Sequence, residues 1–279
     1  MKNITSALIL FLITSVAYSQ KIKGSKAVTI TQKEIGDFET LEVGDNLEVF
    51  LIKGEKSAFE IEADDNLHEV IVADLSAGIL RVSAAQQVTG AKRFSVRITY
   101  TDKLSMIVAK DRTVTTALTD LSVEDITIKT FGESKFFAAV QTKKFMLMAN
   151  DKSKIELNLK SDAATVELSK NANLKALISA GKLTFDMYQK TSATIEGDVI
   201  DMKLRLDNNA NFTGKNLTAK NAQLITEDYS SGSIIASEKA TIAAGGKSEI
   251  QLYGEPKIEV TKFADSAVLQ KRPSTGKLN

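Results

Sequence analysis

The sequence FGESKF at residues 131–136 recurs in altered form as NDKSKI at residues 150–155 and as SKNANL at residues 169–174. In each copy a short polar turn precedes a small or polar residue, and an apolar residue then opens a β-strand. The predicted turns are FGES (131–134), NDKS (150–153), SKNA (169–172), QKTS (189–192), NNAN (208–211), YSSG (229–232), GGKS (245–248) and FADS (263–266). The segment from about 121 to 271 is therefore predicted to be a degenerate internal repeat.

The apolar residue after each turn fixes the period of this repeat. These residues are Phe136, Ile155, Leu174, Ile195, Phe212, Ile234, Ile250 and Val268. Subtracting their positions gives separations of 19, 19, 21, 17, 22, 16 and 18 residues. A recurrence near 19 residues with short strands in every unit predicts an all-β fold, a β-solenoid that resembles a parallel β-helix. The alternative is a β-sandwich with evenly spaced turns.

Apolar and polar residues alternate between the turns. Ile155, Leu157 and Leu159 are separated by Glu156 and Asn158. A period of two buries one face of a strand and exposes the other, and stacked coils can bury that face continuously. We therefore expect the apolar residues that open the strands to lie one above another inside the stack; the interior set is Ile155, Leu174, Ile195, Phe212, Ile234 and Ile250.

Three parts of the chain carry a resemblance to a known family. They are the repeated turns, the C-terminal sequences YGEPKIEV (253–260) and FADSAVLQKRP (263–273), and the block FETLEVGDNLEVFLIKGEKSAFEIEADDNLHEVIV (38–72). Together they resemble the bacterial putative auto-transporter adhesin family with the head GIN domain. The Ser-Gly turns of that family are eroded here, and YSSGS (229–233) is closest to them. The resemblance implies a β-helical stack and an adhesive role.

The N-terminus has the features of a signal peptide. Lys2 gives a positive start, residues 7–16 are apolar, and Ala17 and Ser19 fit the −3 and −1 positions of a cleavage that leaves Gln20 first. The predicted organisation is a signal peptide (1–19), a lead-in segment (20–37), an N-terminal β-region (38–108), the solenoid repeats (109–273) and a short tail (274–279). The N-terminal β-region is expected to cap the stack, because an open first coil would expose a sheet edge.

The composition argues against several classes of partner. The chain has 36 Lys and Arg residues against 35 Asp and Glu residues, a balance that favours neither nucleic acid nor an anionic membrane. There is no cysteine, so neither a disulfide nor a thiol nucleophile is available. No later stretch is long and apolar enough for a transmembrane helix after signal removal.

The case for an enzyme is thin, and we predict no catalytic, cofactor-binding or metal site. The single histidine, His68, lacks the partners that a catalytic base requires, and no GxSxG or HExxH motif is present. Glu62, Asp64 and Asp65 crowd together without the spacing of a calcium loop, which favours a solvated acidic turn. Residues 64–69 are consistent with one helical turn capped by Asp65 or Asn66.

The predicted function is that of an exported, non-enzymatic surface or periplasmic protein, an adhesin or interaction module. Its expected partner is a cell-surface or extracellular protein or glycan, and self-association is left open. Phe131, Tyr229 and Phe263 each precede an apolar opening residue by five positions, which could place aromatic rings at equivalent corners. The alternatives are a carbohydrate-active β-helix lyase or hydrolase, which needs paired carboxylates in a groove, and a self-associating structural protein of the envelope.

Overall fold

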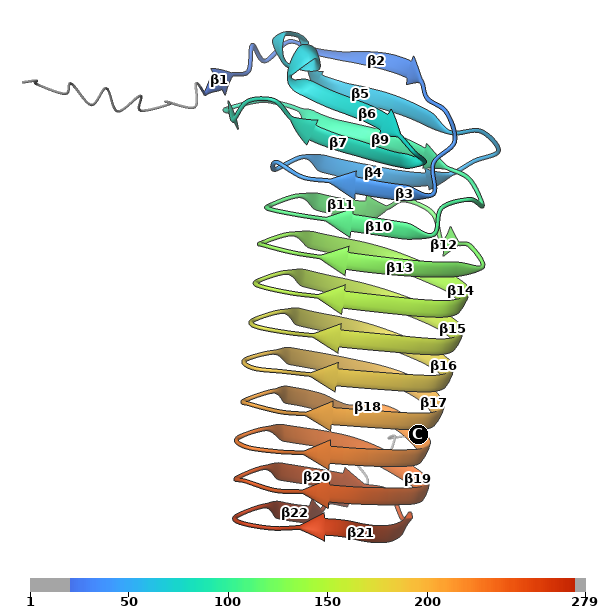
Figure 1. The fold of residues 1–279 in the computed structure, drawn as a ribbon, viewed down its shortest axis with the longest axis vertical. Coiled ribbons are helices and arrows are strands. Elements are labelled where there is room, and N and C mark those ends of the chain that lie inside the picture. Colours follow the sequence, from blue (N-terminus) through green and yellow to red (C-terminus); the bar gives the residue numbers. More distant parts are fainter. Residues whose placement is uncertain (1–20, 274–279) are drawn as a thin grey trace, which may run out of the picture.

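The computed structural model describes residues 21–273, which form a single tall stack of β-strands (Figure 1). Over these residues the chain is 67% strand and 2% helix, and parallel coils form a β-solenoid of about 9 turns with a spacing of about 19 residues. The predicted fold class is confirmed. The signal peptide predicted at 1–19 and the tail predicted at 274–279 lie outside the described residues.

The elements follow one another in a simple order. The N-terminal part contains β1 (Ile22–Lys23), β2 (Val28–Glu34), β3 (Thr40–Val43), β4 (Glu48–Lys53), β5 (Ala58–Asp64), the 3-10 helix η1 (Asp65–Val70), β6 (Ile71–Ser76), β7 (Ile79–Ala84), β8 (Val88–Thr89) and β9 (Phe94–Tyr100). The stack continues with β10 (Met106–Ala109), β11 (Val114–Ala117), β12 (Leu121–Ser122), β13 (Asp125–Thr130), β14 (Lys135–Ala149), β15 (Lys154–Leu168), β16 (Asn173–Met187), β17 (Ser192–Leu206), β18 (Asn211–Thr226), β19 (Ser231–Ala244), β20 (Glu249–Tyr253), β21 (Lys257–Phe263) and β22 (Val268–Lys271).

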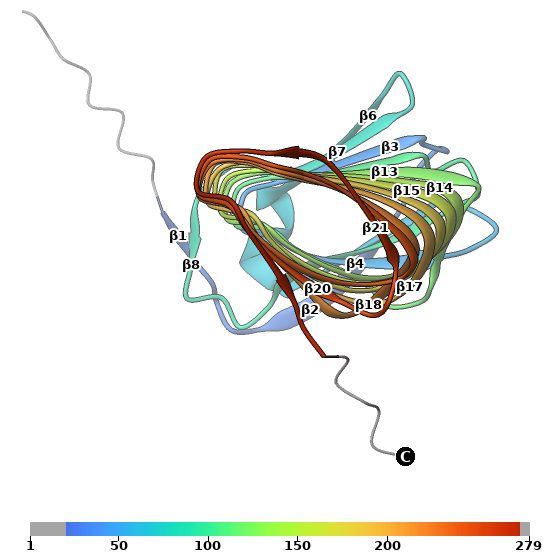
Figure 2. The same ribbon diagram turned by 90° about the horizontal axis from the view of Figure 1, so that it is seen from below.

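Each of the long strands β14 to β19 supplies most of one coil. In β14, residues 135–141 run along a first face, the chain bends near Lys143, and residues 144–149 return along a second face (Figure 2). We call this bend the second corner, and the four-residue turn that leads to the next strand the first corner. Neighbouring strands pair in parallel, with Phe136 opposite Ile155 and Leu147 opposite Val166. The 19-residue recurrence is thus the contour length of one coil.

The core fills the space between the two faces. Phe136, Ile155 and Leu174 lie one above another, and each side chain is at most 1% exposed. Phe185 on the second face meets Phe212 on the first face edge-on, with ring centroids 5.2 Å apart. Burying a large apolar side chain of this kind contributes about 1.5–3 kcal/mol to the free energy of unfolding, so the alternating strands hold the stack together without disulfides.

The first corner is built on a left-handed residue in coil after coil. The second residue of the turn has φ between 55° and 69° at Asp111, Gly132, Asp151, Lys170, Gln189, Asn208, Asp228, Gly246 and Asp265. Asp, Asn and Gly tolerate this conformation best, which explains the polar turns of the sequence. The fourth residue is small and buried, as Ser134, Ser153 and Ala172 show. The turns also stack on each other, since Asn171 N donates a 2.8 Å hydrogen bond to Asp151 O.

The predicted register is correct for part of the stack and wrong for the rest. Leu174 lies opposite Ala193, and Ile195 lies two residues farther along, opposite Ala176. Ile234 likewise lies opposite Gly214, while Gly232 occupies the position in register with Phe212. The corner turns span 188–191, 207–210, 227–230 and 264–267, which differs by one or two residues from the predicted limits. Small residues at interior positions hid the register, because an alternation of large apolar residues cannot mark them.

The last coil shows the same kind of slip. Leu269 pairs with Ile250, whereas Val268 pairs with Glu249 and is 39% exposed. Val268 opens β22, as predicted, but Leu269 and not Val268 takes the position in register with the buried Ile250. A shift of one residue turns a side chain from the interior to the solvent face.

The N-terminal part stacks its coils out of chain order. Strands β3 and β4 pair in parallel with β10 and β11 on one side and with β7 and β9 on the other. Antiparallel pairs then close this end, because β5 joins β9 to β2, and β6 pairs with β7 (Figure 1). The parallel ladder therefore begins inside the region that was expected to cap it, and the antiparallel strands lie beyond its first coil.

The opposite end of the stack is more open. All residues of β21 are exposed, although Ile258 and Val260 pair with the buried residues Ala240 and Ile242. Their side chains thus occupy interior positions that no following coil covers within the part of the chain described. Ile258 is 42% exposed and Val260 is 50% exposed.

Candidate functional site

His68, the single histidine of the sequence, lies in η1 beside β2. Its Nε2 is 2.9 Å from Thr29 Oγ1 and 3.3 Å from the backbone oxygen of Ala63. These contacts tie η1 to β2 and β5. Within residues 21–273, no group of three or more His, Cys, Asp or Glu side chains is placed to hold a metal ion.

Asp64 does not belong to a solvated turn, as was predicted, but is fully buried. Its carboxylate accepts hydrogen bonds from the backbone N–H groups of Lys26, Lys92 and Arg93 at 2.9–3.2 Å. Burial alone raises the pKa of the Asp64 carboxyl, but the N–H groups of Arg93, Lys26 and Lys92 outweigh it and hold that pKa below its ordinary value. Asp64 therefore joins the lead-in segment to β9.

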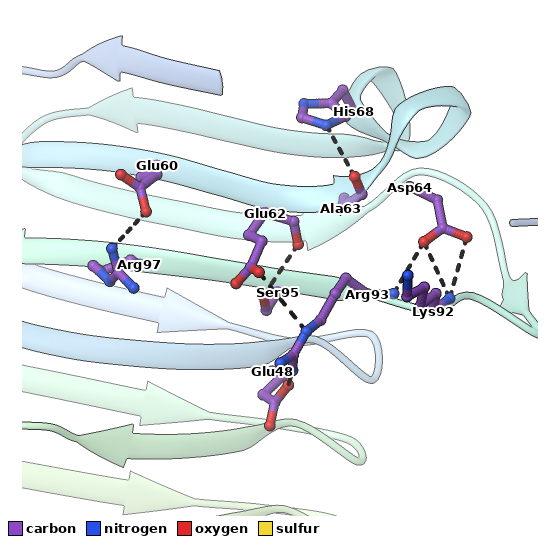
Figure 3. A network of polar contacts seen from close by, with 10 residues as sticks. All are labelled: Glu48, Glu60, Glu62, Ala63, Asp64, His68, Lys92, Arg93, Ser95 and Arg97. Carbon is purple, nitrogen blue, oxygen red and sulfur yellow. Dashed lines mark hydrogen bonds and ion pairs between the residues drawn. The ribbon is translucent and has the colours of Figure 1, made fainter. Parts of the chain in front are cut away.

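The other acidic residues of this region also have structural partners. Glu62 Oε1 lies 3.8 Å from Arg93 Nε, and Asp65 accepts a hydrogen bond from Ser25 Oγ. The N-cap of η1 is Asp64 and not Asp65 or Asn66, and its side chain makes no capping hydrogen bond because it is held by the backbone of other segments. The region consequently connects the N-terminal elements to one another (Figure 3).

The three aromatic residues expected at equivalent corners occupy different places. Phe131 is the first residue of its turn, Tyr229 is the third residue of another, and Phe263 ends β21 before its turn begins. The Tyr229 side chain is 63% exposed, and Lys247 Nζ lies 5.2 Å from the centroid of its ring. The expectation of a matched set is wrong because the limits of these turns differ from those predicted.

A long groove runs along the second corner. It has a volume of about 750 Å³ and extends from β12 to β19. We call it the corner groove; its lining includes Glu124, Gln141, Lys143, Lys160, Asp162, Ser179, Asp198, Ile200, Thr218 and Lys220. These residues are far apart in sequence but repeat at about one coil length, so the parallel register brings them together.

The charges of the corner groove balance. Its lining contains three lysines, Lys143, Lys160 and Lys220, and three carboxylates, Glu124, Asp162 and Asp198. Lys143 Nζ lies 2.8 Å from Glu124 Oε1. The hydrogen bond and the charge of Lys143 lower the pKa of Glu124, which disfavours the protonated form that a general acid requires. The groove offers many hydrogen-bond donors and acceptors without a strong net charge.

Gly181 lines the corner groove where β16 bends, and no side chain projects into the groove at this position. A Cβ atom at this position would lie 2.8 Å from the backbone oxygen of Asp162 on the neighbouring strand. A side chain would therefore push the two strands apart at the second corner. The residues of the groove that sequence reasoning missed, such as Lys160 and Ser179, carry one usable signal, namely their spacing of one coil.

The family model described as "Putative auto-transporter adhesin, head GIN domain" matches residues 37–256, which is most of the chain. The chain belongs to this family. The resemblance seen in the repeated turns is thereby confirmed. No curated protein matches the sequence.

Solved structures of similar proteins share the fold. A protein of Parabacteroides distasonis described as a putative adhesin has a TM-score of 0.69 and 16% identity, and the match covers 90% of this chain and 100% of that one. A putative adhesin of Parabacteroides merdae has a TM-score of 0.61 and 18% identity, with 90% and 99% coverage. A P. distasonis protein described as a putative lipid binding protein has a TM-score of 0.63 and 12% identity, with 91% and 100% coverage. At these identities the likeness shows the fold alone.

Residues 21–273 contain no helix with the length and hydropathy that a membrane span requires.

Proposed function

We propose that this chain is an exported, non-enzymatic interaction module with an adhesive role. Family membership supports an adhesive role and a surface or exported location. We propose that the protein acts in the periplasm, on the outer-membrane surface or in the medium. We further propose that the partner is a cell-surface or extracellular protein or glycan. An extended stack suits this role because it presents a long rigid surface rather than a deep pocket.

The corner groove is the observation that carries the proposal. It crosses consecutive coils of one parallel ladder, so its side chains are held at fixed spacing by backbone hydrogen bonds. Its balanced charges and its amide and hydroxyl groups favour a partner that is rich in hydrogen-bonding groups and low in net charge. A neutral glycan or a polar protein segment fits that description.

Ser179 offers a direct test, because it is exposed in the middle of the corner groove. The protein from Gln20 to Asn279 is applied to arrays of glycans and of extracellular proteins, and Ser179→Trp is expected to weaken the binding that is found by about tenfold, since a bulky ring fills the groove. Gln223→Trp on the exposed second face is the control and should bind like the wild type. Equal binding by all three proteins, or release of cleaved saccharide, would contradict the proposal.

The open end of the stack favours a second role, self-association as a structural protein. Ile258 and Val260 occupy interior positions in β21 and remain exposed, and an uncovered strand edge is a template for pairing with another chain. Light scattering at several protein concentrations tests this role. A concentration-dependent mass that Val260→Lys abolishes would support it, whereas a constant monomer mass would contradict it.

A further inference from the structure

A second concave surface lies at the first corner, on the side of the stack away from the corner groove. It has a volume of about 450 Å³ and joins three consecutive coils. We call it the basic notch; it is lined by Arg112, Val114, Glu133, Lys135, Lys152 and Lys154. Four of these side chains are cationic and one is a carboxylate, so the notch has a strong positive excess.

The carboxylate of Glu133 neutralises only one side of the notch. Its Oε2 lies 3.1 Å from Arg112 Nε, and its Oε1 lies 3.6 Å from Lys152 Nζ. Arg112 in the preceding turn and Lys152 in the following turn are therefore both directed toward Glu133. Lys135 and Lys154 have no carboxylate oxygen within 4.0 Å among residues 21–273.

The parallel register holds these two lysines together. Lys135 on β14 pairs with Lys154 on β15, which places their backbones about 4.8 Å apart, the ordinary spacing of neighbouring strands. Like charges that face each other in this way are destabilising. At other exposed positions opposite charges meet in register, as for Glu156 with Lys175. Where like charges meet, as for Glu167 with Asp186 and Lys239 with Lys257, a neighbouring opposite charge compensates them: Arg205 lies in register with Asp186, and Glu259 Oε2 is 2.9 Å from Lys239 Nζ. The lysine pair therefore lacks the compensation that those positions have, and an anion between the two ammonium groups would supply it.

The first face continues from the basic notch into a shallower groove of about 490 Å³. Phe137 and Leu177 line this groove, and Phe137 lies two residues after Lys135 on the same face of β14. Leu177 is 50% exposed, so its side chain is available to a ligand. A ligand that has an anionic group and rings with an apolar face could therefore occupy the basic notch and the adjoining groove together.

We propose that the basic notch and the adjoining groove bind an anionic saccharide. The sulfate or phosphate ester group lies between Lys135 and Lys154 and within reach of Arg112, and successive sugar rings of the same chain cover Phe137 on β14 and Leu177 on β16, which are two strands apart. Lys and Arg are the side chains that recognise such oxyanions, and their bonds to a charged acceptor are stronger than those to a neutral one. This site is separate from the corner groove, so it does not depend on the function proposed for that groove.

The test uses short dextran sulfate as the probe, with uncharged dextran and sodium sulfate as references, in buffer with physiological salt. Wild-type protein should bind dextran sulfate, and the double variant Lys135→Gln, Lys154→Gln should weaken this binding about tenfold or more, because two charge-assisted contacts are lost. The matched control Lys203→Gln, Lys215→Gln removes the same charge from exposed positions elsewhere and should leave the affinity within about twofold of the wild type. Leu177→Asn should cause a loss of about threefold, because the apolar contact with the ring is removed.

The urea midpoint of the unliganded lysine variant separates binding from folding. This midpoint should equal or exceed that of the wild type, because the repulsion between two like charges is removed. Equal losses of binding in the lysine variant and its control would overturn the proposal in favour of general charge attraction. Binding of sodium sulfate as tight as that of dextran sulfate would overturn the saccharide part. Tighter binding to vesicles that contain phosphatidylglycerol would overturn the proposal and assign the notch to a membrane surface.

Discussion

Leu174 on β16 lies in register with Ala193 on β17, and Ile195 lies opposite Ala176. The large and small residues of neighbouring coils thus complement each other across one pair of strands. Phe212 follows Ala193 in the same register and reaches across the core to Phe185. On the first face of β16, β17 and β18 the interior is therefore a packed arrangement of unequal side chains, in contrast to the stack of large residues formed by Phe136, Ile155 and Leu174.

Ile195 and its neighbour Thr194 test the direction of the side chains in β17. Ile195 is 1% exposed, whereas Thr194 is exposed. Ile195→Asp is expected to lower the free energy of unfolding by about 3–5 kcal/mol, since apolar burial is lost and an unpaired carboxylate is buried. Thr194→Asp should cost less than about 0.5 kcal/mol. Urea melts measure both values, and equal midpoints would show that the strand faces are assigned wrongly.

Ala193 tests the complementarity of size. Its side chain is 2% exposed and pairs with Leu174 on one side and Phe212 on the other. Ala193→Phe should reduce the free energy of unfolding by about 1–3 kcal/mol, because the added ring has no space in a packed core. Thr194→Phe adds a similar ring on the exposed face and serves as the control. A larger loss for the control than for Ala193→Phe would contradict the register.

Gly246 and its neighbour Gly245 test whether the left-handed position of the first corner requires a glycine in this turn. Gly246 has φ +66°, and a Cβ atom there would lie 2.6 Å from Asp228 N, whereas a Cβ at Gly245 would meet only ordinary contacts of 3.5 Å or more. Gly246→Ala should therefore lower the free energy of unfolding by about 1–2 kcal/mol, and Gly245→Ala should change it by less than about 0.5 kcal/mol. Thermal unfolding of the two variants decides between them, and the reverse order would refute this account of the turn.

Asp64 predicts a dependence of stability on pH. Its carboxyl has a lowered pKa in the folded protein, so the charged form stabilises the fold at pH values above the ordinary pKa of about 3.9. That contribution is lost as the pH falls through the lower folded-state pKa. Asp64→Asn should therefore be less stable than the wild type at pH 7, and the difference should shrink below about pH 4.

Urea midpoints between pH 3 and pH 7 measure this difference. Asp74→Asn is the control, because the Asp74 side chain is 64% exposed on β6. A gap between the wild type and Asp64→Asn that stays constant over the whole range would mean that the Asp64 charge does not contribute.

His68 provides a prediction about activity. Its contacts are to Thr29 and to the backbone of Ala63, and it has no acidic or metal-binding partner in the set of residues that the structure describes. His68→Ala should leave the binding of array ligands within about twofold of the wild type, because a lone histidine lacks a catalytic or binding constellation. A large loss of binding with an unchanged circular dichroism spectrum would show that His68 takes part in binding and would contradict this prediction.

The sequence by itself determined the class of fold. Polar turns that recur near every 19 residues, and the strict alternation of Ile155, Leu157 and Leu159 with polar neighbours, are local patterns, and a solenoid is built from local units. The family resemblance also follows from these turns, because it depends on their order along the chain and not on contacts between distant residues.

Only the tertiary structure decided the register, the N-terminal order and the binding surfaces. Ala193 and Gly232 carry no signal of burial in the sequence, yet they occupy interior positions because the lengths of neighbouring coils place them there. Nothing local indicates that β7 and β9 stack beyond β3 and β4. Lys135 and Lys154 are unremarkable along the chain, and they form a basic site because parallel pairing turns a sequence separation of one coil into a distance of one strand spacing.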